Sequence, residues 1–435
     1  MNKFFRISER GSTVRTEIIG GITTFFAMAY IIFVNPDMLC PAMGEELRTS
    51  IMVATCASAA IGCLLTAILA NVPFAQAPGM GLNAFFTYTV CMGMGYTWQQ
   101  ALTIVLLSGI LFLLIAISPL RSKIIASIPA FLKSSISAGI GLFIAFIGLL
   151  NVELISFGSG VPALNFAGNN AGLLALIGLI ITAILMAYKV KGAMVIGIVV
   201  TTLIGLPMGI TTIPESFALE NITLAPVFLK FDFAGTFSKG ILPLITAVIS
   251  FTLVDCFDTV GTLIGTATNA GMTDKNGNLP GGDRALIADA IATCAGSCMG
   301  TSTVTTFVES STGISEGART GLSSIVVGAL FLIAIALAPI AGIIPSAATA
   351  PALIIVGVLM IKGAVKVKWT DIEEAVPAFL TISVMPFAYS ISDGIGFGLI
   401  SFTLIKMARG KFKEIPVLVY ILSALFILKY VLTNI

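Results

Sequence analysis

Long runs of apolar residues, separated by short polar loops, fill most of the chain. Clear examples cover residues 18–34, 51–69 and 322–337. A helix needs about 20 residues to cross the hydrocarbon layer of a bilayer, so these runs have the length of membrane-spanning helices. They lack the alternation of apolar and polar positions that is typical of barrel strands. The pattern therefore predicts an all-α polytopic membrane protein.

The same pattern predicts fourteen spans in two sets of seven. The first set lies near residues 18–34, 51–70, 75–92, 101–118, 130–150, 171–188 and 193–210. The second set lies near residues 240–264, 285–300, 302–318, 320–342, 347–363, 373–391 and 393–408. Residues 417–428 are left over. They form a further span or an interfacial helix, or they indicate that residues 373–408 contain fewer spans.

The composition agrees with a protein surrounded by lipid. Of the 435 residues, 57% are hydrophobic and only 10% are charged, which leaves too little polar surface for a soluble globule. A formal charge of +2 gives no indication of a nucleic-acid partner. The seven cysteines lie mostly inside apolar segments and the chain has no histidine, so we expect no zinc or other metal cofactor.

The positions of the charged residues predict an orientation. Basic residues stay on the cytoplasmic side of short loops. If the amino terminus is cytoplasmic, every second loop should be basic, and these loops contain Arg121, Lys123, Lys189, Lys191, Lys366, Lys368 and Lys406. The opposite loops contain Glu45, Glu46, Glu153, Glu215 and Glu220. We therefore expect a multi-pass protein of the cell membrane with a cytoplasmic amino terminus.

A polar linker divides the chain into two similar halves. Residues 18–210 and 240–408 flank the linker at residues 211–239, with a terminus at residues 1–17 and a last segment at residues 409–435. Seven crossings per half give the halves opposite orientations, as in the inverted repeats of many secondary transporters. The third span of each half, the third and tenth of the chain, is interrupted, at residues 76–81 and 311–315.

The two interruptions form a candidate ligand site. A broken helix exposes amide N–H groups at the start of its second part, here near Gly79, Thr312 and Gly313. Such donors can hold a carbonyl group or an anion near the middle of the bilayer. The alternative is that glycine and proline only kink well-packed helices, which is common in membrane proteins.

Three carboxylates lie inside predicted spans, where an ionisable group is expensive and is therefore a functional candidate. Asp255 and Asp258 are three residues apart and share a helix face, and Glu309 directly precedes the second interruption. The alternative role is to cap a broken helix without touching a ligand. Other charged residues lie near predicted span ends, where snorkelling or ion pairing explains them; they are Lys133, Asp289, Glu316 and Arg319.

Carboxylates at such a site favour a flat ligand with N–H groups along one edge, because an ionised carboxylate accepts two hydrogen bonds side by side. Purine bases have such edges. A buried carboxylate near another carboxylate also resists ionisation, so one member of the group formed by Asp255, Asp258 and Glu309 could carry a proton. Coupling to protons would then need no other cofactor.

Four stretches of the chain resemble the AzgA-like purine permeases of the nucleobase-cation symporter family. They are RTEIIGGITTF at residues 15–25, APGMGLNAF at 77–85, DCFDTVGTL at 255–263 and ESSTGISEGARTGL at 309–322. The resemblance extends to residues 377–380 and so covers nearly the whole chain. It implies purine and proton symport by fourteen spans in two inverted repeats. It also implies a core domain (about 18–118 and 240–342) and a gate domain (about 129–210 and 347–435).

The resemblance also implies roles for individual residues. Carboxylates of the eighth and tenth spans bind the base in relatives, and the matching positions here are Asp258 and Glu309. Asn83 matches a position near the third-span break that is linked to transport. Phe307 lies where, in the more distant uracil carriers, an aromatic ring can lie against the base. The uracil carriers have a histidine one turn after the eighth-span carboxylate, but this chain has Thr262 there. Proton coupling would therefore use carboxylates. A homodimer is a candidate assembly.

Several other functions compete with this interpretation. A carrier of uracil or of an organic anion could share the fold, although an anion carrier should place cationic or neutral donors at the interruptions. An intramembrane aspartyl protease needs catalytic aspartates on separate helices, whereas Asp255 and Asp258 share one helix. A passive channel is a further alternative, and saturation of uptake together with failure to concentrate the substrate would distinguish it. Among these classes the sequence favours a transporter over an enzyme.

Overall fold

The computed structural model describes residues 2–119, 127–157, 161–166, 168–213, 222–274 and 279–433. Four charged residues used above to predict the orientation lie outside these ranges, namely Arg121, Lys123, Glu215 and Glu220.

The first part of the chain consists mainly of helices joined by short loops. Its elements are α1 Asn2–Phe5, α2 Val14–Met28, α3 Ile31–Met43, η1 Glu45–Leu47, α4 Arg48–Leu65, η2 Thr66–Ala70, β1 Gln76–Pro78, α5 Met80–Ala84, η3 Phe85–Gly93, α6 Trp98–Ile117, α8 Ala130–Asn151, β2 Ile155–Ser156, β3 Ala163–Leu164, α9 Asn170–Ala187 and α10 Ala193–Gly205. The short strands β2 and β3 pair with each other in an antiparallel hairpin.

The second part of the chain also consists mainly of helices joined by short loops. Its elements are α11 Phe233–Ser238, α12 Ile241–Asn269, α13 Gly282–Met299, β4 Val304–Thr306, α14 Ser310–Ser315, α15 Gly321–Ala334, η5 Ile335–Ile343, α16 Ser346–Met360, η6 Ile361–Lys366, α17 Ile372–Phe387, α18 Ile391–Ala408, η7 Phe412–Glu414 and α19 Val417–Thr433.

The helices coincide with the apolar ranges that the sequence predicts, to within several residues at most ends. Nine helical segments of the described chain are long and apolar enough to cross a membrane. Others are shorter because they are interrupted, as at β1 and β4, or because they end early, as α10 does. Residues 417–428 lie in α19, a helix of 17 residues. The protein is therefore all-helical and polytopic.

Polar residues determine where several helices begin. The side chain of Thr13 accepts a hydrogen bond from the Thr16 amide at the start of α2. Thr97 and Gln100 form a reciprocal capping box at the start of α6. Each of these side chains satisfies an amide that has no partner within its helix, and in the case of Gln100 the satisfied amide is that of Thr97 itself.

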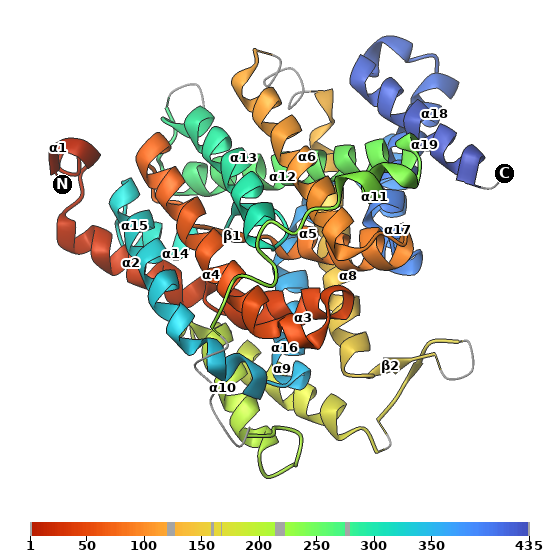
Figure 1. Cartoon of the computed structure of the whole chain (residues 1–435). Coiled ribbons are helices and arrows are strands. Elements are labelled where there is room, and N and C mark those ends of the chain that lie inside the picture. Colours follow the sequence, from red (N-terminus) through yellow and green to blue (C-terminus); the bar gives the residue numbers. More distant parts are fainter. Residues whose placement is uncertain are drawn as a thin grey trace.

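The elements form two groups that meet at the centre of the molecule (Figure 1). One group contains α2, α4, α13, α14 and α15, which lie around the pair of β1 and β4. The other contains α8, α9, α16, α17 and α18, and α8 packs against both α16 and α17. Helix α8 of the second group also contacts α12 and α5, and these contacts join the two groups.

The second interruption lies earlier in the sequence than predicted. Residues 311–315, which we expected to break the tenth span, belong to helix α14. The chain is instead extended at β4, which pairs antiparallel with β1 so that Gln76 lies opposite Thr306 and Pro78 opposite Val304. Threonine and valine favour extended backbone, whereas Ser311–Ser315 contains only one glycine and stays helical.

A buried carboxylate connects the two groups of helices away from their centre. Asp37 of α3 is 4% exposed and accepts hydrogen bonds from Thr349 Oγ1 at 2.6 Å and Ser346 Oγ at 3.0 Å, both in α16. Arg48 at the start of α4 pairs with the same carboxylate at 3.3 Å. Asp37 thus joins α3 to two other elements, α16 and α4.

We expect Asp37→Ala to lower the free energy of unfolding by about 3 kcal/mol, because it removes the partner of a largely buried cation and two hydroxyl donors. Thermal unfolding of the purified protein in detergent measures this effect. Glu45→Ala is the matched control, since Glu45 pairs with the same Arg48 but is 69% exposed, and it should cost less than about 1 kcal/mol. Equal melting temperatures for the two variants would contradict the structural role of Asp37.

Candidate functional site

The pair of β1 and β4 lies where two interrupted spans cross, and each strand leads into a short helix. Backbone groups of the two segments satisfy one another. The Phe307 amide donates to the Ala75 carbonyl at 3.0 Å, and the Gly79 amide donates to the Thr303 carbonyl at 3.0 Å. Unpaired backbone groups would be costly away from water, so these contacts allow a non-helical backbone inside the protein.

Two carboxylates flank this crossing. Asp258 of α12 is half-buried, and its carboxylate lies near the side chain of Thr305 in β4. Glu309 is half-buried at the N-cap of α14 and accepts a hydrogen bond from the Tyr30 hydroxyl at 2.7 Å. The charges of Asp258 and Glu309 are close enough to influence each other. The structure thus brings together the two acids that are predicted from the sequence to bind the base.

Asp255 lies one turn earlier on α12 and differs from Asp258 in its surroundings. It is 1% exposed, and its Oδ2 accepts a hydrogen bond from Thr293 Oγ1 at 2.9 Å. Its Oδ1 has no hydrogen-bond partner among the described residues. Its charge interacts with those of Asp258 and Asp289. Asp255 is therefore placed to interact electrostatically with the acids of the site. It is not placed to contact a ligand in the open part of the site.

Asp289 was wrongly interpreted from the sequence as a residue near a span end that could snorkel. It is fully buried in α13. Its Oδ1 accepts hydrogen bonds from Gln76 at 3.0 Å and from Thr306 at 3.1 Å, and its Oδ2 accepts one from Thr259 at 2.9 Å. The donors belong to β1, β4 and α12, so Asp289 holds together the three elements that surround the crossing.

Of the uncharged candidates, Asn83 is the one whose side-chain amide makes no hydrogen bond to the described residues. It is fully buried, and neither its amide nitrogen nor its amide oxygen has a hydrogen-bond partner among the described residues. Buried polar groups without partners are rare and mark places where a water or a ligand completes the structure. Phe307 is 7% exposed and directly follows β4.

The helix starts offer fewer free donors than the sequence suggested. The Gly79 amide is already paired, as described above. The Thr312 amide and hydroxyl both donate to the Glu309 carbonyl, at 2.9 and 2.7 Å. Gly313 packs against Gly20 of α2, where a side chain on Gly313 would collide with the Gly20 carbonyl. In this conformation Thr312 and Gly313 shape α14 and its packing, and the side chains of Asp258 and Glu309 supply the acceptors.

The remaining charged residues at predicted span ends are paired as expected. Glu316 forms an ion pair with Lys191 at 2.7 Å, and Arg319 donates to the Ile314 carbonyl at 2.7 Å. Lys133 lies over the ring of Phe257, 5.7 Å from its centre.

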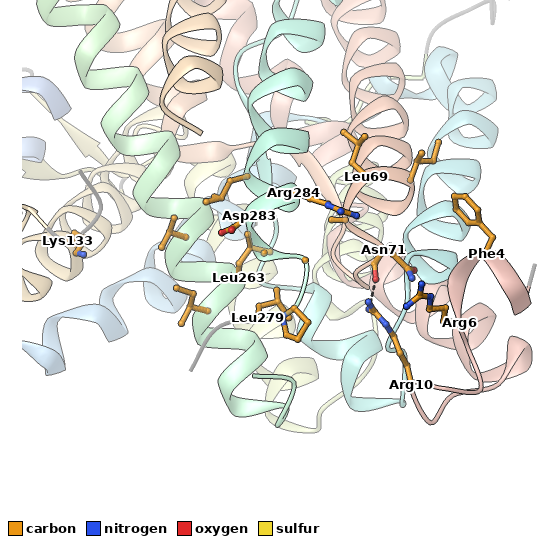
Figure 2. A pocket seen from close by; sticks show the side chains of 18 residues that line it. Phe4, Arg6, Arg10, Leu69, Asn71, Lys133, Leu263, Leu279, Asp283 and Arg284 are labelled. Atoms are coloured by element: carbon orange, nitrogen blue, oxygen red, sulfur yellow. Dashed lines mark hydrogen bonds between the residues drawn. The ribbon is translucent and has the colours of Figure 1, made fainter. Parts of the chain in front are cut away.

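A separate cavity of about 1120 Å³ lies beside the amino-terminal segment (Figure 2). Neither Asp258 nor Glu309 lines it. Arg10 donates to the Asn71 carbonyl at its edge, at 2.6 Å. Burial and the neighbouring charge of Arg6 lower the pKa of Arg10.

Three contributors to the site were not predicted as such: Tyr30, Thr305 and Asp289. Tyr30 lies within an apolar run and gave no signal in the sequence. Thr305 could have been found from its place in the polar stretch before Glu309. Asp289 is the residue whose type alone should have raised suspicion, because a carboxylate inside a predicted span is a functional candidate wherever it lies.

Comparison with known proteins places the chain among transporters. A model of the Permease family, Xan_ur_permease, matches residues 15–397. The chain is 42% identical to the adenine permease AdeP of Escherichia coli over 439 residues, covering 99% of this chain and 96% of AdeP. It is 41% identical to the guanine/hypoxanthine permease PbuG of Bacillus subtilis over 441 residues, covering 99% of both proteins.

The fold also resembles that of a solved transporter with little sequence similarity. The transmembrane domain of the bicarbonate transporter BicA, from a cyanobacterium, aligns with a TM-score of 0.60 at 17% identity. The alignment covers 90% of this chain and 95% of that domain.

We expect Asp289→Ala to destabilise the crossing, because three buried donors lose their acceptor and each unsatisfied group costs about 1–3 kcal/mol. The melting temperature of the purified protein measures the loss. Asp283→Ala, which changes an exposed aspartate in the first turn of the same helix, is the control and should cost about 1 kcal/mol or less. A melting temperature for Asp289→Ala equal to that of the control would show that Asp289 does not hold the crossing together.

Proposed function

Because the chain belongs to the Permease family, we propose that it is a secondary active transporter that imports purine nucleobases by proton symport. The observation that carries this proposal is the placement of Asp258 and Glu309 on either side of the crossing, half-buried and close enough to interact. Adenine and guanine/hypoxanthine permeases at about 40% identity over their full length support the substrate class.

The chemistry of the two acids suits a purine. Each carboxylate accepts hydrogen bonds at two oxygens, and a purine presents N–H groups in one plane. Asn83 can both donate and accept, so it complements a base that carries both kinds of group. Phe307 offers an aromatic face against which the base can stack. Organic anions fit this arrangement poorly, because two carboxylates repel them.

Proton coupling would use the same acids. The site contains no histidine, and Asp255, Asp258 and Glu309 interact electrostatically in pairs. A proton that binds one of them reduces the repulsion between the two acids that face the base. Binding of the base and of the proton would then favour each other, which is the requirement for symport.

Movement between the two sides would separate the groups of helices described above. We propose that they correspond to a core domain (about 18–118 and 240–342) and a gate domain (about 129–210 and 347–435), arranged as two inverted repeats of seven spans. The core would carry the base by sliding or rocking against the gate. The Asp37 contacts with α16 and the ion pair between Glu316 and Lys191 cross this boundary at two places and would change during the cycle.

The proposed orientation places the amino terminus in the cytoplasm and the protein in the cell membrane, with a homodimer as a candidate assembly. A carrier of uracil or of another small solute on the same fold is the alternative within this class, and a passive channel is the alternative in another class. Competition of labelled hypoxanthine uptake by purines and pyrimidines separates purine transport from uracil transport.

Glu309→Gln and Asp258→Asn should each abolish uptake of labelled guanine or hypoxanthine while the protein still reaches the membrane. Each change removes a charged acceptor for the base but keeps nearly the same shape. Uptake by cells that lack other purine carriers, normalised to the amount of protein in the membrane, measures the effect. The exposed residues Glu46 and Asp371 supply the controls, Glu46→Gln and Asp371→Asn, which should transport normally. Normal uptake by both site variants would refute the proposed site.

Uptake should concentrate the base, because the proton gradient drives it. A protonophore removes this gradient and should therefore reduce the internal concentration of the base to the external one. The inside-to-outside ratio of labelled hypoxanthine in proteoliposomes with an imposed pH gradient is the quantity to measure. Accumulation that survives the protonophore would rule out proton symport, and saturable uptake without any accumulation would indicate facilitated diffusion.

A further inference from the structure

The first predicted span contains a break that the sequence did not reveal. Helix α2 ends at Met28 and α3 begins at Ile31, with Ala29 and Tyr30 in a turn between them. Tyr30 occupies the N-cap position of α3 and is 1% exposed. The turn therefore places a rigid aromatic side chain in the interior of the protein, level with the start of α14.

The hydroxyl of Tyr30 donates a hydrogen bond to Glu309 Oε1 at 2.7 Å. Hydrogen bonds to an ionised acceptor are shorter and stronger than those between neutral groups. The two residues are 279 positions apart in sequence, so the bond joins the first span to the tenth.

Glu309 is held from its other end as well. Its carbonyl accepts from the Thr312 amide and hydroxyl, and the Ser310 amide donates to the Phe307 carbonyl at 3.2 Å. The backbone of Glu309 is thus fixed by α14, and its carboxylate is fixed by Tyr30. A long side chain that is free to rotate loses conformational entropy on binding, whereas one that is already fixed does not.

We propose that Tyr30 is a positioning residue for base recognition, which orients the Glu309 carboxylate so that its remaining lone pairs meet the N–H edge of the base. Each carboxylate oxygen has two lone pairs, so the bond to Tyr30 leaves acceptors for the ligand. The proposal rests on the proposed function of Glu309 as a purine ligand. Tyr30 acts through Glu309 and does not itself need to contact the base.

Tyr96 provides a matched comparison for removing a tyrosine hydroxyl. It is 3% exposed, and its hydroxyl has no hydrogen-bond partner among the described residues. Its ring lies 5.2 Å from the Lys239 ammonium, a contact that phenylalanine preserves. Tyr96→Phe therefore makes the same chemical change as Tyr30→Phe without removing a bond to a carboxylate.

The test compares guanine uptake kinetics of the wild-type protein, Tyr30→Phe and Tyr96→Phe in proteoliposomes. Loss of a hydrogen bond to a charged group should raise the KM of Tyr30→Phe by roughly tenfold to a hundredfold with little change in maximal rate. Tyr96→Phe should keep the wild-type KM. Inhibition by guanine derivatives methylated at single ring nitrogens adds a second readout. The wild-type protein should prefer guanine over the derivative that lacks the N–H bound by Glu309. This difference in affinity should be smaller in Tyr30→Phe, whereas a general packing defect would weaken the binding of all ligands equally.

The outcomes separate this inference from the proposed function. If the wild-type protein transports no purine, the proposed function fails. If it transports guanine and Tyr30→Phe matches Tyr96→Phe in KM, only the positioning role fails. A lower maximal rate and melting temperature with unchanged KM would show that Tyr30 acts only in packing, which also overturns the inference.

A second variant covers the case in which Tyr30→Phe does not fold. Incorporation of 3-fluorotyrosine at position 30 keeps the ring and the hydroxyl but makes the hydroxyl a stronger donor. A changed KM with fluorotyrosine at position 30, absent with fluorotyrosine at position 96, supports the positioning role. Wild-type KM for both substitutions contradicts it.

Discussion

The structure depends on satisfying polar groups in the interior of a protein that lies in lipid. Where β1 and β4 cross, neither segment is helical, so their backbone groups pair with each other and with neighbouring residues. Asp289 completes this arrangement by accepting from Gln76, Thr306 and Thr259. Without such internal partners an extended backbone could not persist in a membrane. The crossing in turn positions Asp258 and Glu309, because Thr305 and the N-cap of α14 belong to it.

The helices and the two site acids could be predicted from the sequence because both depend on local information. Apolar runs of sufficient length indicate spans regardless of their neighbours. Asp258 and Glu309 stand out because ionisable residues are expensive in such runs. The match to the Permease family and the similarity to BicA in fold agree with the predicted membrane spans, whereas the roles of Asp258 and Glu309 stay a prediction. Most span ends were predicted to within a few residues, but the first predicted span, residues 18–34, belongs to a helical segment that extends from Val14 to Met43.

The contacts between distant segments could not be predicted in the same way. Tyr30 looks like one more apolar residue until the tenth span is placed beside it. The second interruption was expected at the glycine and serines of residues 311–315, but pairing with β1 places it at β4. Asp289 was assigned to a span end because its burial depends on how α13 packs against α4 and β4. In each case the contacting residues lie far away in sequence. The pattern of apolar and polar positions does not reveal where their helix or strand lies in space.

The central claim is that a purine docks by its N–H edge onto Glu309 and Asp258 beside the crossing. The most direct measurement is a structure of the protein in lipid nanodiscs with guanine bound. Nitrogen atoms of the base should lie within about 2.7–3.2 Å of carboxylate oxygens of both residues, with Tyr30 still bonded to Glu309. A base bound elsewhere, with both carboxylates engaged only by other protein groups, would contradict it.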